Sequence, residues 1–204
     1  PNVYGPFLIL PLLLLARGIL TSRLRDAKWK IVGFLIILLA ILVSFSRAAW
    51  GMSLGTLVIV ALLAFINERS RLARFRLVAY AIGGIMAVGM LLSVAISIPT
   101  VHQLFVERAS IVQEYDEGRL GRFERHLLGF YLIQEKPLGI GPFVFGQTFG
   151  EDEHNMWLKG FTVYGWLGGF SYIILAIWTL AAATPLLFKP RPWQGIVQCA
   201  YAAF

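Results

Sequence analysis

Cysteine and charged residues are both scarce in this sequence. The chain of 204 residues contains one cysteine, Cys199, so it cannot form an internal disulfide, and it has no Cys/His spacing typical of a zinc site. Only 14% of the residues are charged, whereas 58% are hydrophobic. A soluble domain of this size needs far more polar surface, so the composition excludes a typical soluble domain and predicts a membrane protein.

Long apolar stretches follow one another along most of the chain. They cover residues 1–16, 31–46, 48–66, 77–98 and about 157–187, and a sixth begins at Trp193. Such stretches are typical of membrane-spanning helices. We therefore predict an all-α fold, a polytopic transmembrane helix bundle of about five spans plus a truncated sixth. Because the sequence starts without a methionine and stops inside an apolar run, we interpret residues 1–204 as a single transmembrane domain and a fragment of a larger protein.

Basic residues cluster in three short segments, residues 17–30, 69–76 and 189–191. Because basic residues near helix ends remain in the cytoplasm, these segments are predicted to be cytoplasmic. Alternating spans then place the turn at 45–50 and the long loop at 99–155 on the extracytoplasmic side. Orientation and contact with anionic membrane lipids account for the net charge of +7, which therefore does not indicate nucleic-acid binding.

The long loop gathers most of the polar residues and is the expected location of an active site. Within residues 122–134, apolar side chains recur at helical spacing on one face, which predicts an amphipathic helix lying at the membrane surface. Pro137 is expected to end it. The following P-L-G-I-G-P predicts a tight turn, in which Gly139 and Gly141 permit positive φ and the close approach of another backbone or a ligand.

Three interpretations of His154 are open. It could bind a metal together with the acids at 151–153, although adjacent residues rarely converge on one ion. His154 and Asn155 could instead cap the helix that follows, as asparagine does well. Thirdly, His154 could be a general base or proton carrier, unless the neighbouring carboxylates keep it protonated for a charge-stabilising role.

Arg47 stands alone at a helix boundary on the predicted extracytoplasmic side. An ionisable group at a membrane edge is costly unless it has a partner or reaches the interface. Arg47 therefore either extends to lipid phosphates or has a functional partner.

Three pieces of sequence, taken together and in order, resemble one protein family. They are S-R-A-A-W-G at 46–51, G-R with the amphipathic segment and P-L-G-I-G-P at 121–142, and H-N-M-W-L with Y-G-W-L-G-G at 154–169. The combination, which covers about residues 31–187, is similar to the O-antigen ligase and O-antigen polymerase superfamily of bacterial membrane glycosyltransferases.

The resemblance implies glycan transfer at the periplasmic face of the bacterial inner membrane, in cell-surface polysaccharide synthesis such as that of lipopolysaccharide or exopolysaccharide. The donor would be a glycan on undecaprenyl diphosphate. The acceptor would be lipid A-core for a ligase, or another lipid-linked repeat for a polymerase. The reaction would invert the anomeric centre and would need no metal, nucleotide or other cofactor.

The resemblance also implies roles for particular residues. Arg47 and Arg122 would contact the diphosphate, because arginine offers a fixed charge and paired donors to phosphate oxygens. His154 would activate or orient the acceptor hydroxyl. The candidate catalytic residues are thus His154, Arg122 and Arg47, and the candidate substrate-binding residues are Arg47, Arg122, Gly139, Gly141 and Asn155.

Two positions depart from the family pattern, and other residues compete for the same roles. Phe143 stands where many members have a small residue, and His126 stands where an aromatic residue such as tryptophan is common. His126 is therefore a rival to His154. Arg119 and Arg125 compete with Arg122, which we prefer for its G-R context.

Other functional classes make different predictions. A transporter of lipid-linked glycans should show broken helices or ionisable groups near mid-membrane. The stretches at 31–46, 48–66 and 77–98 contain no charge, which favours chemistry at the membrane surface. A non-catalytic scaffold would make Arg47, Arg122 and His154 dispensable.

Overall fold

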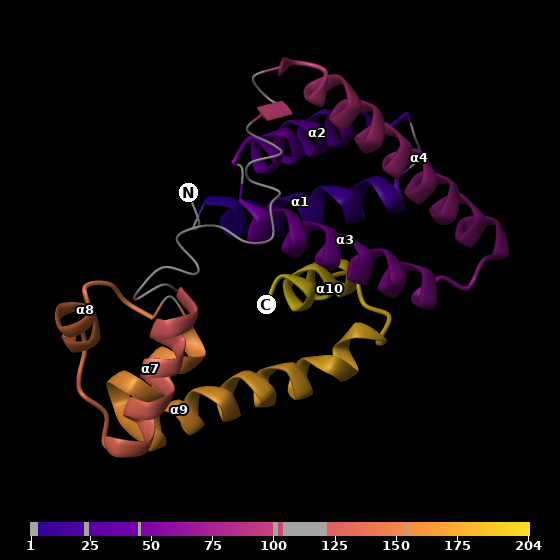
Figure 1. The fold of residues 1–204 in the computed structure, drawn as a ribbon. Coiled ribbons are helices and arrows are strands. Elements are labelled where there is room, and N and C mark those ends of the chain that lie inside the picture. The colour runs from indigo at the N-terminus through magenta and orange to yellow at the C-terminus, as the bar shows by residue number, and fades with distance from the viewer. Residues whose placement is uncertain (1–3, 23–24, 45, 100–101, 104–121, 154) are drawn as a thin grey trace. The chain divides into compact units, whose positions relative to one another are not determined.

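The computed structural model describes residues 4–22, 25–44, 46–99, 102–103, 122–153 and 155–204, and within these ranges it contains helices and no strand (Figure 1). The predicted all-α class is confirmed. The helices are α1 (Tyr4–Thr21), α2 (Lys28–Val43), α3 (Arg47–Asn67), α4 (Arg71–Ile96), α7 (Arg122–Glu135), α8 (Val144–Phe149), α9 (Met156–Ala183), the 3-10 helix η1 (Thr184–Leu187) and α10 (Gln194–Ala203).

Four segments are long and apolar enough to cross a membrane. They are Tyr4–Thr21, Arg47–Asn67, Arg71–Val94 and Met156–Leu187. The 16-residue α2 does not reach this length. At about 1.5 Å per residue, α2 covers roughly 24 Å, which is less than the roughly 30 Å of a hydrocarbon core. The multi-span membrane class is thus borne out, and the count of five spans stays a prediction.

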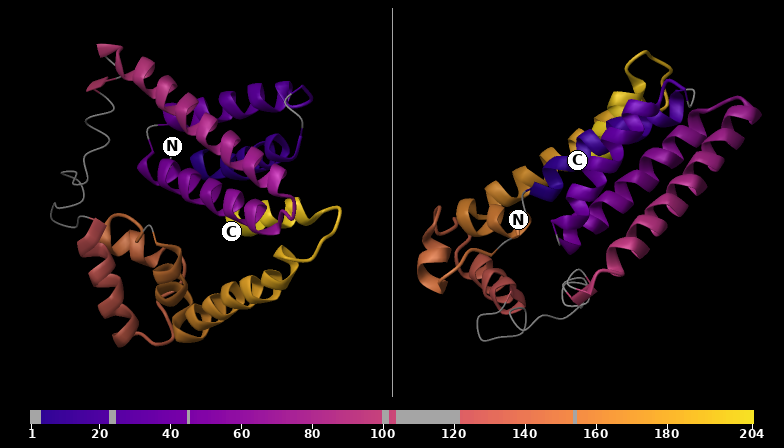
Figure 2. Two further views of the ribbon diagram at one scale, coloured as in Figure 1. Left: turned by 90° about the vertical axis from the view of Figure 1, so that its right-hand side faces the viewer. Right: turned by 90° about the horizontal axis from the view of Figure 1, so that it is seen from above.

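The chain divides into two compact units, and each is described by itself. The first unit comprises Pro1–Ala109 and Ala183–Phe204. In it α1 packs against α2, α3 and α10 (Figure 2). Leu12 and Leu13 of α1 are fully buried, and Gly5 lies so close to α3 that an added Cβ would come within 2.2 Å of the Ala49 Cβ. Small residues at such a crossing let helix backbones approach closely.

The sequence S-R-A-A-W-G forms the start of α3. The Ser46 hydroxyl accepts a hydrogen bond from the Ala49 amide at 3.4 Å and so caps the helix. The Trp50 indole donates to the Ile41 carbonyl of α2 at 3.1 Å. Arg47 is the first helical residue and is half-buried. This piece of the family pattern therefore fixes where α3 begins and how it meets α2.

The second unit, Ser110–Ala182, holds α7, α8 and α9. The predicted amphipathic helix is confirmed as α7, which ends at Glu135, two residues before Pro137. Leu127, Phe130 and Tyr131 of α7 are more than half exposed. Its apolar side chains are therefore left uncovered by the described part of the chain, and the location of α7 at the membrane surface stays a prediction.

The longest helix, α9, is broken at Gly165, which the sequence analysis did not predict. Gly165 has φ 70° and ψ −167°, outside the helical region. The break removes the helical partners of the Thr162 and Val163 carbonyls. These carbonyls instead accept hydrogen bonds from the Ile140 and Gly141 amides, at 2.8 and 3.1 Å. The P-L-G-I-G-P turn is thus hydrogen-bonded to the backbone of α9 where that helix is broken.

A third backbone hydrogen bond runs in the opposite direction, from the Trp166 amide to the Pro137 carbonyl, at 2.8 Å. Gly139, at φ 80°, lies against the break, where an added Cβ would come within 2.5 Å of the Val163 oxygen and 2.6 Å of the Gly165 nitrogen. The expected positive φ is confirmed for both Gly139 and Gly141, and the close approach of another backbone is confirmed for Gly139. We call these three hydrogen bonds the backbone clasp.

A short helix, α8, lies within the predicted loop at 99–155. It begins after Phe143, which has a left-handed φ of 66° that is unusual for a bulky residue. Phe145 is 2% exposed, and its ring lies 4.7 Å from that of Phe149. The apolar side of α8 thus anchors the chain between the clasp and α9.

Glycine at the clasp should be required for stability. Gly165→Ala and Gly139→Ala each place a Cβ against backbone atoms at positive φ, so each should lower the free energy of unfolding by about 1–3 kcal/mol. The matched control is Gly160→Ala in the same helix, where the nearest non-local contact would be an ordinary 3.5 Å. The control should be neutral or stabilising by up to about 1 kcal/mol. Reversible unfolding in mixed detergent micelles measures all three, and equal effects would contradict the clasp.

Candidate active site

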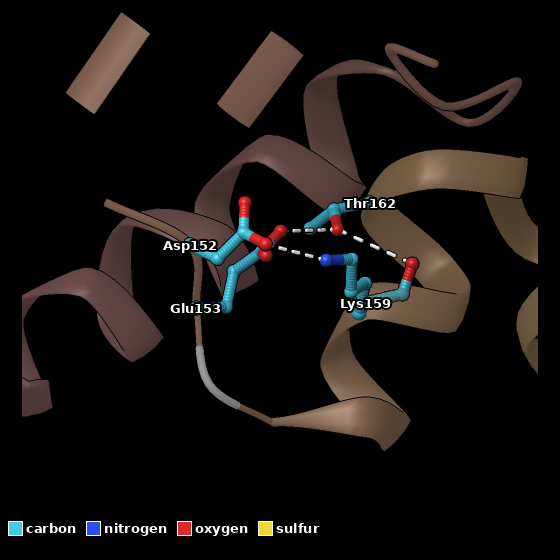
Figure 3. Close-up of polar contacts among 4 residues, drawn as sticks. All are labelled: Asp152, Glu153, Lys159 and Thr162. Atoms are coloured by element: carbon cyan, nitrogen blue, oxygen red, sulfur yellow. Dashed lines mark hydrogen bonds and ion pairs between the residues drawn. The ribbon is translucent and has the colours of Figure 1, made fainter. Parts of the chain in front are cut away.

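The acids before α9 are each engaged by a different partner rather than gathered around one point. Glu151 forms an ion pair with Arg125 of α7. Asp152 forms an ion pair with Lys159 of α9 at 2.6 Å (Figure 3). Where the structure is described, no group of three or more His, Cys, Asp and Glu side chains could hold a metal ion. His154, the proposed partner of these acids in a metal site, lies outside the described residues.

Glu153 is the most deeply buried of these acids, at 1% exposed. Its Oε1 accepts a hydrogen bond of 2.5 Å from the Thr162 hydroxyl of α9 (Figure 3). Its Oε2 is buried and has no hydrogen-bond partner among the described residues. Burying a carboxylate with one hydrogen bond from a neutral hydroxyl is costly, and the positive charge of Lys159 nearby offsets part of that cost.

His126 of α7 reaches the same loop. Its Nε2 lies 2.8 Å from the Glu153 carbonyl oxygen. A carbonyl oxygen can only accept, so this contact selects the form of the ring in which Nε2 carries a hydrogen. The residue that departs from the family pattern therefore holds the backbone immediately before His154.

The Arg125 side chain is mostly buried and forms an ion pair within the protein. Its side chain is 11% exposed and pairs with Glu151, which is 64% exposed. The Arg125 Nε is buried without a partner in the described part of the chain. Arg125 therefore ties α7 to the loop before α9, whereas the role of its rival Arg122 remains a proposal.

Asn155 caps α9, as one of the three interpretations expected. Its side-chain oxygen accepts hydrogen bonds from the Trp157 and Leu158 amides, at 3.0 and 3.2 Å. These amides have no partner within the helix, and an asparagine cap supplies one. The described segment on each side of His154 is thus held by hydrogen bonds to α7 or α9.

The remaining predicted site residues are distributed over both units. Arg47 begins α3 in the first unit, and Arg122 begins α7 in the second. The side chain of Arg122, all of His154 and the rival Arg119 lie outside the described residues. Gly141 donates one hydrogen bond of the clasp, and the backbone of α9 fills the space beside Gly139.

Sequence reasoning missed the contact between Glu153 and Thr162, although a signal for it was present. Once Asn155 is recognised as a helix cap, Lys159 and Thr162 lie three residues apart on one face of α9. Two polar side chains on that face, directly after three acids, indicate that the loop folds back onto the helix. Figure 3 shows both side chains pointing toward the acids.

These features define a class, a multi-span helical membrane protein with a polar site built between an amphipathic helix and the start of a broken span. The family model described as O-antigen ligase matches residues 32–173, which is more than half of the chain. The chain belongs to the O-antigen ligase family, and the resemblance noted in the sequence is confirmed. No curated protein and no solved structure gave a significant match.

The contribution of the Asn155 cap to the stability of α9 can be measured separately from other interactions. Asn155→Ala should destabilise the start of α9 by about 1 kcal/mol, whereas Asn155→Asp should retain the cap. In hydrogen exchange, the Trp157 and Leu158 amides should exchange faster in the alanine variant, because both lose their acceptor. Unchanged exchange at these two amides would contradict the cap.

Proposed function

We propose that this protein is a glycosyltransferase of the O-antigen ligase type. It transfers a glycan from undecaprenyl diphosphate to an acceptor hydroxyl on lipid A-core or a similar lipid, at the periplasmic face of the inner membrane. The observation that carries the proposal is the family match, because residues 32–173 contain every residue of the candidate site. Membership of this family supports an enzyme that uses a lipid-linked glycan donor and an acceptor.

In the proposed reaction the acceptor hydroxyl attacks the anomeric carbon of the donor. The new glycosidic C–O bond forms as the C–O bond to the diphosphate breaks, and undecaprenyl diphosphate leaves as an anion. His154 takes the proton of the hydroxyl or orients it for attack. Attack from the face opposite the leaving group inverts the anomeric centre.

Arg47 and Arg122 stabilise the leaving diphosphate. Each guanidinium carries a fixed positive charge and paired N–H donors that match phosphate oxygens. Charge held in place before the reaction stabilises the developing anion in a poorly hydrated site. With two arginines in this role, the proposed step needs no metal.

The break in α9 resembles one feature of transporters, whose broken helices use freed backbone groups to bind substrate or ions. Here the Thr162 and Val163 carbonyls and the Trp166 amide are bonded to the turn at 137–141. Because these groups are already satisfied, the break supports a fixed site rather than a transport path.

A polymerase remains the alternative within the family, since it differs only in its acceptor.

Removing a proposed catalytic side chain should abolish transfer. Arg47→Ala, Arg122→Ala and His154→Ala should each lower kcat by roughly 100–1,000-fold, the loss typical of one preorganised donor. The assay uses the full-length protein in nanodiscs with undecaprenyl-diphosphate-linked glycan and lipid A-core, and it follows the acceptor's mobility on a gel. Arg71→Ala, an exposed arginine at the start of α4, should leave the rate unchanged.

The same assay separates the alternatives. Chain growth on a second molecule of donor, without transfer to lipid A-core, would replace the ligase by the polymerase. Loss of activity in Arg125→Ala or His126→Ala, with Arg122→Ala and His154→Ala active, would move the chemistry to the rival residues. Full activity in all of these variants would contradict the proposed enzyme.

The proposed orientation can be tested by labelling. Thr148→Cys on α8 and Ser70→Cys before α4 are both exposed positions, and Cys199→Ser provides a background without cysteine. A membrane-impermeant maleimide added to intact spheroplasts should label Thr148→Cys and should label Ser70→Cys only after lysis. Labelling of both positions from outside would contradict the orientation inferred from the basic clusters.

A further inference from the structure

We propose that a polar pocket at one end of the first unit binds the phosphate group of an anionic phospholipid. The pocket has a volume of about 330 Å³, far more than a single water molecule needs, and its lining includes Arg17, Glu68 and Arg76. We call it the basic pocket. The proposal goes beyond the proposed function, because this pocket belongs to a different unit from the acidic loop and takes a different ligand.

The basic pocket forms where four helices begin or end on the same side of the unit. Its walls come from the last turns of α1 and α3 and from the first turns of α4 and α10 (Figure 1). The basic clusters at 17–30, 69–76 and 189–191 belong to this end of the helices, which the sequence predicts to be cytoplasmic. The pocket is therefore expected at the level of the cytoplasmic headgroups, where anionic lipids attract basic residues.

Arg17 extends into the basic pocket from a helix that is otherwise apolar. It is half-buried, and its Nε is buried with no hydrogen-bond partner among the described residues. The side chain lies against α10, where a Cβ on Gly195 would come within 3.3 Å of both its Cγ and its Nε. Cys199 and Glu68 interact with its charge electrostatically, but the Nε–H still lacks an acceptor in the described part of the chain. An ionisable side chain at such a depth is costly unless a partner is present, which here indicates a ligand.

The charges of the lining favour an anion. Arg76 of α4 lines the same pocket and is exposed. Glu68 opposes the two arginines, and its Oε1 already accepts a hydrogen bond from the Ser70 amide at 3.0 Å. Two guanidinium groups and one carboxylate leave the lining with a net positive charge. Guanidinium groups also present paired N–H donors that match phosphate oxygens.

The uncharged polar groups of the lining already hold the helices together. The Gln194 side-chain nitrogen donates to the Asn67 side-chain oxygen at 2.9 Å and to the Leu187 carbonyl at 2.8 Å, which joins α10 to α3 and η1. The Thr21 hydroxyl donates to the Arg17 carbonyl at 2.9 Å. These bonds fix the walls of the pocket, so its arginines are the groups suited to hold a ligand.

A neighbouring hollow favours a lipid over a soluble phosphate. This hollow, of about 530 Å³, runs beside α4 and shares Ala73 and Arg76 with the basic pocket. Leu72 and Phe75 line it and are 79% and 72% exposed. An apolar hollow that adjoins a positively charged pocket matches a molecule in which a phosphate is joined to an acyl chain. Inorganic phosphate would leave the hollow empty.

The test measures lipid binding by native mass spectrometry of the full-length, delipidated protein in detergent. Phosphatidylglycerol is the anionic probe, and phosphatidylcholine is the reference lipid without net charge. Arg17→Gln should weaken phosphatidylglycerol binding by roughly 10–100-fold, because a hydrogen bond to a charged group is lost, and should leave phosphatidylcholine binding unchanged. Arg71→Gln is the matched control, because it removes an equal charge at the start of α4 but does not line the pocket. It should weaken binding by less than about fivefold.

A second variant should change the affinity in the opposite direction. Glu68→Gln removes the acid of the lining, so it should strengthen phosphatidylglycerol binding by roughly two- to fivefold. Its control is Asp26→Asn, an exposed acid just before α2, which should have a smaller effect. A gain of affinity cannot arise from misfolding, so this pair decides the question even if Arg17→Gln is unstable. Thermal unfolding in phosphatidylcholine nanodiscs monitors the fold of each variant.

Inorganic phosphate, titrated in the same way, separates the two sources of a phosphate group. Binding of inorganic phosphate that depends on Arg17, without binding of phosphatidylglycerol, would overturn the lipid assignment. Equal losses in Arg17→Gln and Arg71→Gln would show general attraction to a basic surface and would overturn the pocket. Unchanged phosphatidylglycerol affinity in Arg17→Gln, or weaker binding in Glu68→Gln, would overturn it as well.

Discussion

A spanning helix that breaks must find new partners for its backbone groups, because hydrocarbon offers none. In α9 the break at Gly165 frees two carbonyls, and both are bonded to amides of the turn after α7. This requirement explains why Gly139 in the turn faces Gly165 in the helix, since a Cβ on either residue would meet backbone atoms of the other segment. The placement of the acidic loop against α9 depends on the same junction, because Thr162 takes part in both.

Much of the fold could be predicted from sequence because it follows from composition and period. Apolar stretches indicated the long helices, and the helical spacing of apolar residues placed the end of α7 to within one residue. The break in α9 could not be predicted, because glycine is common in membrane helices and α9 also contains Gly160, Gly168 and Gly169, which stay helical. Which glycine breaks the helix is decided by a turn that lies elsewhere in the chain.

The candidate site was predictable to a smaller extent. Asn155 was identified as a possible cap because capping depends on local sequence. The three acids beside it look alike in sequence, yet Glu151 is exposed and Glu153 is buried. That difference depends on which acid meets Thr162 and which meets Arg125, and such pairings are properties of the tertiary structure.

The two units also differ in how their contacts are spread along the chain. The side-chain hydrogen bonds that join α7 to the loop before α9 and to α9 itself link residues 26, 27 and 33 positions apart. By contrast, the hydrogen bond from Cys199 to Leu13 in the first unit links residues 186 positions apart. Contacts close in sequence form sooner, because a short loop costs less entropy to close. During synthesis, the unit that carries the candidate site should therefore be able to assemble as a helical hairpin before α10 completes the bundle around α1.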